Sequence, residues 1–557
     1  MERNSTFKKF VDLISYTPDK KANRFTLPDD KAQGDGSSVL ESKQENNPAV
    51  SPLASKKKKN QHSTFDEQIN FIKESFNVPT NKDIVIREFV IANKYKAFVV
   101  YIDGMADRTT INDFILRPLL NLDVKNLPEA CALDYIIENV LQTNEIEITK
   151  DNQEIIYKVL LGDTGLYIEG CDSYVFSETK GFDMRGVEQP STESVVKGPQ
   201  EAFNENTRTN ITLIRRIIKN SRLTTEFLTL GRRNNNLCSV VYIDGLANVD
   251  IVQEVKRRLN SLDVDFIAGD GMLEQFIEDH PNSIIPTILS TERPDRVAAY
   301  LAEGRIAIIS EGTPFVLIVP LTIVSLFHSP EETYLKWQVG TTMRFLRVFA
   351  LFLATLLPGV YVALTNFHRE MIPTDLLIAI AQAREAVPFP TIAEIIFMEL
   401  AFELIREAGV RIPGIIGSTI GIIGGLILGQ AAVEANLVSP ILVIIIALTG
   451  LGSFAIPNYS LSFAIRILRV GFIIIGAFVG FYGITLLILA ILGLTTTLKS
   501  FGVNVLSPFT PVTRKEDDAI IRKPMWKQER RPDYINPQEI KRQPKFSRAW
   551  EHENPES

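Results

Sequence analysis

The chain has 557 residues, 45% of them hydrophobic, and a formal net charge of −7 at neutral pH. Its Lys and Arg residues are spread along the chain, which excludes the concentrated basic face of a nucleic-acid-binding protein. The three cysteines, Cys131, Cys171 and Cys238, lack metal-ligand spacing and are too few to staple a secreted fold, so we expect a reducing, cytoplasmic setting. Common nucleotide-binding, metalloprotease and hydrolase motifs are absent, and the chain holds five His. We therefore expect no catalytic residue, no bound metal and no cofactor.

Residues 1–64 have the composition of a disordered, polar and basic arm. From about residue 19 the segment is rich in Lys, Asp, Asn, Ser, Gln and Pro, and it ends in lysines from Lys56 to Lys59. Such a composition buries too little apolar surface to offset the entropy lost on folding. The lysines suit anionic lipid headgroups, although a solubilising tail explains them more simply. The first residues contain no apolar signal-peptide core, so we expect no export by a cleaved leader.

Residues 65–340 have the pattern of a mixed α/β protein, with short apolar runs, turn signals and amphipathic stretches. The segment V-V-Y-I-D-G-M-A at 99–106 recurs as V-V-Y-I-D-G-L-A at 240–247, and a helical stretch follows each copy. This repeat predicts two related α/β cytoplasmic subdomains, 65–190 and 208–340. Between them, from Gln189 to Arg208, Pro, Ser, Glu, Asn and Gly accumulate, as in a linker.

Each copy of the repeat ends in an Asp-Gly pair, Asp103-Gly104 and Asp244-Gly245. At the carboxyl end of a strand, such an Asp could bind a ligand, as in many α/β sheets. A structural turn explains the pair more simply, because Asp bonds to nearby backbone and Gly accepts positive φ. We therefore favour the structural interpretation.

Residues 344–500 are expected to form an α-helical, polytopic membrane domain. Val348 to Phe367 contains no charged residue, which is enough to cross a hydrocarbon core of about 30 Å. Arg344 and Arg347 place the start of this span on the cytoplasmic side. Pro358-Gly359 at its middle is expected to kink the helix and is a candidate for a gating element. Three further apolar stretches are Pro413–Val433, Leu437–Tyr459 and Val470–Leu498.

The number of membrane-embedded segments stays open between four and six. Four spans would put both termini inside, but they leave Arg466 and Arg469 on the outer face, against the positive-inside tendency. Counting an acidic helix as a span, with Gly312–Phe327 or a divided Val470–Leu498 as a sixth, removes the conflict. The charged tail, 501–557, is expected in the cytoplasm.

The acidic helix is predicted over residues 391–409, between prolines. Thr391 and Glu394 have the spacing of a capping box, and Gly409 marks the end. Carboxylates placed among membrane spans cost several kcal/mol unless water, ions or Arg partners compensate them. They are therefore candidates for function.

Three carboxylates of this helix, Glu399, Glu403 and Glu407, fall within about 80° of one another and form an acidic stripe. In one interpretation, Arg406 and Arg411 form ion pairs with these carboxylates, and the helix lies at the membrane interface. In the other, oligomerisation turns the stripe into carboxylate rings that attract cations to a pore.

A glycine stripe follows the acidic helix. Glycines recur at every fourth position, at Gly417, Gly421, Gly425 and Gly429. This spacing lets helix backbones approach closely. Packing within one chain explains the stripe as well as a self-association face or a pore wall does.

Three segments carry a family resemblance. They are P-D-R-V-A-A-Y-L-A-E-G-R-I-A-I-I-S-E-G-T-P-F-V-L-I-V-P, F-P-T-I-A-E-I-I-F-M-E-L-A-F-E-L-I-R-E-A-G-V-R-I-P-G-I-I-G and G-Q-A-A-V-E-A-N-L-V-S-P. These segments resemble the A subunit of bacterial spore germinant receptors, the GerA family. The similarity covers about Asn81 to Pro511, and the second segment is long and specific.

The resemblance implies a multi-pass protein of the spore inner membrane. It implies a receptor that senses nutrients together with a permease-like B subunit and a lipoprotein C subunit, and that starts germination. It also implies a homo-oligomer in membrane lipid that conducts monovalent cations and is not an enzyme. The resemblance does not assign pore residues, so the two stripes are candidates on physical grounds alone.

Other classes of function remain as alternatives. A secondary transporter needs related membrane halves, and no repeat occurs in the membrane region. A membrane-anchored enzyme needs a catalytic constellation between residues 65 and 320, where none is visible. A non-conducting scaffold or signalling subunit for the permease-like sensor is the strongest rival to a nutrient-gated channel.

Overall fold

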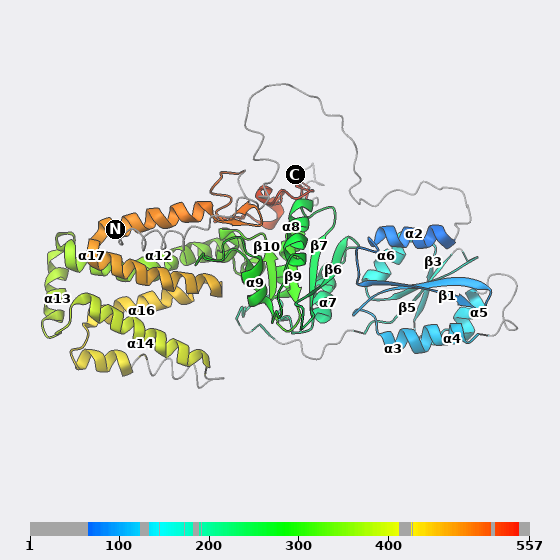
Figure 1. The fold of residues 1–557 in the computed structure, drawn as a ribbon, viewed down its shortest axis with the longest axis horizontal. Helices are drawn as coiled ribbons and strands as arrows, with labels where there is room; N and C mark the ends of the chain where they lie inside the picture. Colours follow the sequence, from blue (N-terminus) through cyan, green and yellow to red (C-terminus); the bar gives the residue numbers. More distant parts are fainter. Residues whose placement is uncertain are drawn as a thin grey trace, which may run out of the picture.

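The computed structural model places two α/β subdomains and a helical region in a row (Figure 1). It describes residues 65–122, 133–143, 145–171, 173–181, 189–190, 192–411, 425, 427–513 and 518–544. The predicted N-terminal arm, 1–64, lies outside these residues. The predicted order of subdomain, subdomain and helical region is confirmed.

Subdomain 1 is a five-stranded antiparallel sheet in the order β1-β2-β4-β5-β3, with helices on both faces. Its strands are β1 (Ile84–Ile91), β2 (Tyr95–Ile102), β3 (Ile146–Thr149), β4 (Thr164–Ile168) and β5 (Tyr174–Ser177). Its helices are α2 (Phe65–Ser75), α3 (Arg108–Thr110), the π-helix η2 (Ile111–Leu116), α4 (Arg117–Leu120), α5 (Leu133–Asn139) and α6 (Asn152–Leu160).

Subdomain 2 repeats this topology, because its strand order β6-β7-β9-β10-β8 has the same sequence of positions. Its strands are β6 (Leu223–Leu230), β7 (Asn236–Ile243), β8 (Leu289–Thr291), β9 (Ile306–Ser310) and β10 (Val316–Val319). Its helices are α7 (Thr207–Ile217), α8 (Val249–Asn260), α9 (Asp270–Ile277), α10 (Pro294–Glu303) and α11 (Ile323–Phe327). The internal repeat therefore corresponds to two copies of one fold.

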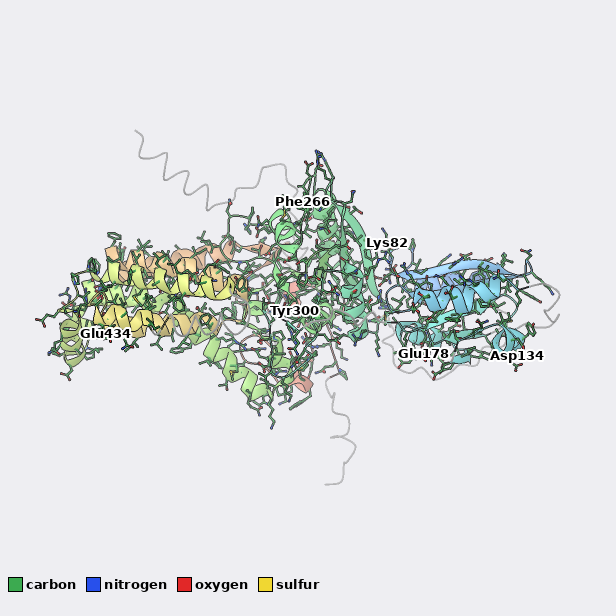
Figure 2. The ribbon with its side chains drawn as sticks, turned by 90° about the horizontal axis from the view of Figure 1, so that it is seen from below. Lys82, Asp134, Glu178, Phe266, Tyr300 and Glu434 are labelled. Atoms are coloured by element: carbon green, nitrogen blue, oxygen red, sulfur yellow. The ribbon has the colours of Figure 1, made fainter. Side chains whose placement is uncertain are left out.

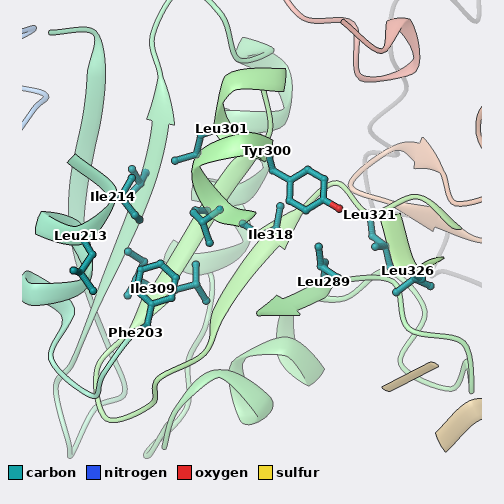
Figure 3. Close-up of a cluster of buried hydrophobic side chains, with 14 of the residues drawn as sticks. Phe203, Leu213, Ile214, Leu289, Tyr300, Leu301, Ile309, Ile318, Leu321 and Leu326 are labelled. Atoms are coloured by element: carbon teal, nitrogen blue, oxygen red, sulfur yellow. The ribbon is translucent and has the colours of Figure 1, made fainter. Parts of the chain in front are cut away.

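Strand β7 shows why the repeated segment is apolar throughout. Successive strand residues point to opposite faces, and here both faces are covered. Val241 and Ile243 pack in one buried cluster, part of which Figure 3 shows around Leu301 and Ile309. Val240 packs in a second cluster on the other face. A sheet buried on both faces therefore has a continuous apolar central strand.

The two subdomains are joined by a buried polar contact. Arg215 and Asp83, whose side chains are 1% and 3% exposed, form an ion pair between α7 and the start of β1. Arg215 also donates to the carbonyl of Leu223 at 2.8 Å. Lys82, labelled at the junction in Figure 2, donates its backbone N–H to the carbonyl of Thr225 at 3.0 Å. The connection is thus built from charge and backbone contacts.

The predicted linker, Gln189–Arg208, is docked in its described part. Glu292 accepts hydrogen bonds from the hydroxyl of Thr192 at 2.8 Å and the N–H of Glu193 at 3.0 Å. Arg293, which is fully buried, donates to the carbonyl of Pro199 at 2.8 Å. These contacts fasten the segment to subdomain 2.

The helical region comprises five helices within the described part of the chain. They are α12 (Trp337–Phe367), α13 (Thr374–Arg384), α14 (Thr391–Arg411), α16 (Pro440–Phe454) and α17 (Tyr459–Thr497), with short 3₁₀ turns η4 (Pro330–Tyr334) and η5 (Arg369–Met371) beside α12. Among the described helices, α12 and α17 are long and apolar enough to cross a membrane.

Helix α17 is a hairpin of two helical arms, 459–479 and 481–497. Gly480 separates them, with φ 65° and ψ −150°. A Cβ placed on Gly471 of the first arm would lie 3.9 Å from Leu487 of the second, so the arms pack side by side. The division of Val470–Leu498 that the sequence left open is therefore observed.

Gly312–Phe327 is not a membrane segment. It contains β10 and α11, and Leu317, Val319 and Leu326 are fully buried within subdomain 2. Its apolar character comes from a strand covered on both faces, which a hydropathy pattern does not distinguish from a short membrane segment.

The described part of the C-terminal tail packs back on subdomain 2. It contains β11 (Lys499–Ser500), β12 (Val503–Asn504), η6 (Met525–Lys527) and η7 (Asp533–Ile535). Phe501, Tyr534 and Ile535 join the buried cluster on the second face of the sheet. The tail thus completes the core of a subdomain that begins about 300 positions earlier in the chain.

Candidate functional site

The acidic helix is observed as α14, beginning at Thr391 as predicted. Glu394 is 1% exposed, and its carboxylate accepts a hydrogen bond from the backbone N–H of Ser439 at 3.1 Å. Arg384 lies 3.4 Å from the same carboxylate. Glu394 therefore ties the start of α14 to the start of α16 and to α13.

The acidic stripe faces two arginines of the first arm of α17. Glu399 pairs with Arg469 at 3.3 Å, and Glu403 pairs with Arg466 at 2.9 Å. Arg406 of the same helix also pairs with Glu403, as predicted from the sequence. Glu399 and Glu403 are therefore compensated within one chain.

Burial distinguishes the members of the stripe. The side chain of Glu399 is 14% exposed and that of Arg469 is 2% exposed, whereas the side chain of Glu403 is 44% exposed. Glu407 is exposed, and the side chain of its predicted partner Arg411 is outside the described residues. The stripe thus runs from a buried ion pair to the surface of the protomer.

An aromatic ring supports the outer ion pair. The guanidinium of Arg466 lies 3.7 Å from the ring centre of Phe463, and that of Arg406 lies 5.5 Å from it. A guanidinium over an aromatic face is stabilised by the ring quadrupole. Glu403, Arg406, Arg466 and Phe463 therefore form one charged cluster.

In the sequence, Arg466 and Arg469 stand out as an exception to the positive-inside tendency, and nothing there pairs them with the stripe, as the structure does. In the structure, Gly480 lies at the end of α12, against Phe367 and His368. The arm 459–479 therefore runs alongside α12 in the same direction, with Arg466 in the half nearer subdomain 2 and Arg469 at the middle of the arm. Their spacing of three residues on one helix face was the available signal.

The glycine stripe is only partly visible. Gly417 and Gly421 lie outside the described residues. A Cβ on Gly429 would make an ordinary contact with Val443 of α16 at 3.5 Å, whereas a Cβ on Gly425 would meet nothing within 4 Å. Gly429 thus packs within the chain, whereas a Cβ on Gly425 would point into unoccupied space.

Helices α12 and α17 approach each other closely at Gly359. A Cβ on Gly359 would lie 2.7 Å from the carbonyl oxygen of Phe472, and a Cβ on Gly476 would lie 2.6 Å from the carbonyl oxygen of Gly359. Helix α12 continues through Pro358 without a break. The backbone leaves helical φ and ψ values at Gly480, inside α17. Gly359 is therefore a contact point between α12 and α17.

The two Asp-Gly turns have different surroundings. Gly104 and Gly245 both have positive φ, 85° and 75°, as the turn interpretation requires. Asp103 pairs with Arg108 at 2.6 Å and also with Arg208 of subdomain 2. Because both sheets are antiparallel, the rule that places ligands at the carboxyl ends of parallel strands does not apply.

The second turn is docked differently. Asp244 is exposed, and the following residues receive the tail: Leu246 and Ala247 accept hydrogen bonds through their carbonyls from Gln538 at 3.0 and 2.8 Å. Each turn thus lies where a later segment of the chain attaches. Among the described residues, no group of three or more His, Cys, Asp or Glu is placed to hold a metal ion.

Comparison with known proteins identifies the family. The family described as Bacillus/Clostridium GerA spore germination protein matches residues 70–534. Spore germination protein KA of Bacillus subtilis (strain 168) is 40% identical over 474 residues, covering 85% of this chain and 87% of that protein. Spore germination protein GerLA of Bacillus cereus is 37% identical over 465 residues, covering 83% and 94%. The chain belongs to the GerA family of spore germination proteins.

A solved structure is also similar to part of the chain. The N-terminal domain of the A subunit of the Bacillus megaterium spore germinant receptor GerK3 is 32% identical, with a TM-score of 0.37. The match covers 46% of this chain and 97% of that chain.

Membership in the GerA family makes this protein an A subunit of a spore germination receptor and a membrane protein. The matched range ends at residue 534, within η7, and so includes most of the docked tail. Both sheets, the helical region and the tail as far as Tyr534 therefore lie inside the family match, whereas Ile535 and Gln538 lie just beyond it.

Proposed function

We propose that this GerA-family protein forms an oligomeric, nutrient-gated cation channel in the spore inner membrane, acting with a permease-like B subunit and a lipoprotein C subunit. The observation that supports it most is the acidic stripe of α14, which faces Arg466 and Arg469 among apolar helices. Ionisable groups in such surroundings are energetically expensive and are typical of ion pathways.

The ion pairs give the channel a closed state. With Glu399 and Glu403 bound to arginines, their negative charge is compensated and attracts no cation. Moving the first arm of α17 relative to α14 would free the carboxylates to face water, where rings of carboxylates select cations. The nutrient has to favour this open arrangement over the closed one, since a ligand with equal affinity for both shifts nothing.

The test is the cation current of purified protein in a planar bilayer, first alone and then with its partner subunits. We expect current in the native chain and reduced cation selectivity in Glu403→Gln. Glu385→Gln, which changes an exposed carboxylate near the end of α13, is the matched control and should conduct like the native chain. Unchanged selectivity in Glu403→Gln would move the ion path away from the stripe.

The glycine stripe is tested separately through assembly. A Cβ added at Gly425 would meet nothing within 4 Å, so Gly425→Ala adds a methyl group without a clash. If this surface joins protomers, the variant should shift the oligomer to smaller species in native mass spectrometry and slow germination. Normal oligomers and normal germination would show that Gly425 does not join protomers.

One observation favours a second candidate, a non-conducting scaffold. The stripe carboxylates are compensated within a single protomer, so they can serve packing of α14 against α17 alone. Absence of current from demonstrably oligomeric protein, with and without the partner subunits, would favour the scaffold.

A further inference from the structure

A cavity lies where subdomain 2 meets the membrane helices. Its volume is about 170 Å³, and four separate segments line it. Ile323 and Phe327 come from α11, Val348 from the start of the uncharged stretch of α12, Leu506 and Phe509 from the chain after α17, and Ile520 from the tail.

The polar groups at this cavity are engaged with one another. His328 Nε2 lies 2.9 Å from the carbonyl of Ala519, and burial lowers the pKa of this imidazole well below its ordinary value, with Arg344 adding to the effect. Arg344 donates to the same carbonyl at 2.9 Å and lies 2.5 Å from Glu332. Because their hydrogen-bonding groups are occupied elsewhere, the surface left to a ligand is apolar.

The rim of the cavity is apolar and exposed. Phe509 and Ile520, which line the cavity, are 45% and 38% exposed, and the neighbouring Val512 is 89% exposed. Two partly exposed tryptophans flank a nearby contact, Trp337 at the start of α12 and Trp526 in the tail. In this contact, Arg522 of the tail donates hydrogen bonds to the backbone carbonyls just before α12, those of Glu332, Thr333 and Leu335. Tryptophan is typical of the boundary between a bilayer and water.

We propose that this cavity binds a hydrocarbon chain of a membrane lipid. An apolar cavity of about 150 Å³ stays dry and takes up benzene-sized ligands, and this cavity is of similar size. A lipid chain suits it because Val348 leads directly onto the membrane-facing surface of α12, where Phe349 and Phe352 are exposed. The proposal requires only that the protein is in a membrane and is independent of ion conduction.

Occupancy has a structural consequence. The lipid chain would contact α11, α12, the segment after α17 and the tail at once, so its burial would stabilise their junction. Bound lipid would then strengthen the connection between subdomain 2 and the membrane helices.

The experiment uses the full-length protein in vesicles of phosphatidylethanolamine and phosphatidylglycerol that carry a photoreactive diazirine on one acyl chain of phosphatidylglycerol. After irradiation, mass spectrometry maps the adducts. We expect adducts at Phe327, Leu506 and Phe509, in addition to adducts at the exposed Phe352.

Ala519→Phe fills the cavity while keeping the backbone carbonyl that Arg344 and His328 contact. It should lower adduct yield at Phe327 and Leu506 at least tenfold and leave Phe352 unchanged. Ala381→Phe, the same change at an exposed position on α13, is the matched control and should label like the native protein. If Ala519→Phe does not fold, Ala519→Leu replaces it.

Three results would overturn the proposal. One is that no cavity residue of the native protein is labelled. Binding of benzene to the cavity would not alter that conclusion, because the proposed occupant is a lipid chain. Another is labelling of Phe327 and Leu506 that survives filling of the cavity. The third is loss of cavity labelling when the partner subunits are present, because an apolar side chain of a partner would then be the occupant.

Discussion

At the scale of single residues, the ion pairs of α17 decide how charge is tolerated among apolar helices. Arg469 is almost fully buried and faces Glu399, so each charge compensates the other. Removing one member of such a pair leaves an uncompensated charge, which costs far more than the pair contributes when intact.

We expect Glu399→Gln to destabilise the protein by about 3–5 kcal/mol, because Arg469 then stays buried without its counter-charge. Glu399→Leu combined with Arg469→Met should recover most of this loss. Thermal unfolding of the native protein, Glu399→Leu, Arg469→Met and the variant with both changes forms a double-mutant cycle, which measures the coupling free energy between the two side chains. Additive effects of the two single changes would contradict a pairwise role.

A second prediction concerns pH and lies in subdomain 2. Burial, followed by repulsion from Glu278, raises the pKa of Glu274 to about 7, and burial also raises that of Glu278 to about 7. The folded state therefore holds these protons more tightly than the unfolded state. Their stabilising contribution is complete below the ordinary Glu pKa and is lost as pH rises through about 7.

We expect the melting temperature of the native protein to fall between pH 5 and pH 8. The corresponding loss in the free energy of unfolding is on the order of 1–2 kcal/mol, after allowing for the partial exposure of Glu274. Glu274→Gln combined with Glu278→Gln should flatten the profile. Glu311→Gln, at an exposed position of the same subdomain, should keep the native slope. An equal slope in all three proteins would refute the assignment.

At the scale of elements, Gly480 turns an apolar stretch of 39 residues into a hairpin. Its φ of 65° suits glycine, and Phe367 and His368 leave no room for a side chain. The hairpin in turn returns the chain to the side of subdomain 2, where β11 and the tail begin. One residue thus sets the direction of the last membrane element.

We expect Gly480→Ala to destabilise the helical region by about 1–3 kcal/mol, since only glycine readily adopts this backbone conformation and the added Cβ would lie 2.9 Å from His368 Cε1. Gly493→Ala is the matched control, because nothing lies within 4 Å of that position and alanine favours a helix. The measurement is thermal unfolding in detergent. Equal behaviour of the two variants would show that Gly480 does not need its positive φ.

At the scale of the whole molecule, the tail links the membrane helices to subdomain 2. The hydroxyl of Ser500 accepts the N–H of Leu321 at 2.9 Å, and the carbonyl of Val505 accepts that of Ile323 at 2.7 Å. Further along, Ile535 enters the core with no exposed surface. A movement of α17 would therefore be transmitted directly to subdomain 2.

We expect Ile535→Ala to destabilise subdomain 2 by about 2–5 kcal/mol, the usual cost of truncating a buried Ile. Hydrogen exchange of amides in β7 and α8 should accelerate in this variant. Ile540→Ala, at a site that is 45% exposed, should leave exchange unchanged. Native exchange in Ile535→Ala would mean that the tail is not part of the folding unit.

Sequence patterns alone were sufficient to predict several elements of the fold. The repeat V-V-Y-I-D-G predicted two related subdomains, the uncharged run from Val348 predicted a membrane-spanning helix, and the Asp-Gly pairs predicted turns with positive φ. The apolar run and the Asp-Gly pairs depend on neighbouring residues alone, through apolar length and backbone preference, and the repeat needs only a comparison of two segments of the sequence.

Which distant residues meet depends instead on the three-dimensional fold. Arg466 and Arg469 pair with carboxylates more than 60 positions earlier, and Ile535 completes a core about 300 positions away from its first strand. The apolar run Gly312–Phe327 belongs to a sheet rather than to the membrane because other elements cover both its faces. Charge compensation and burial depend on partners in space, and a local pattern contains no information about those partners.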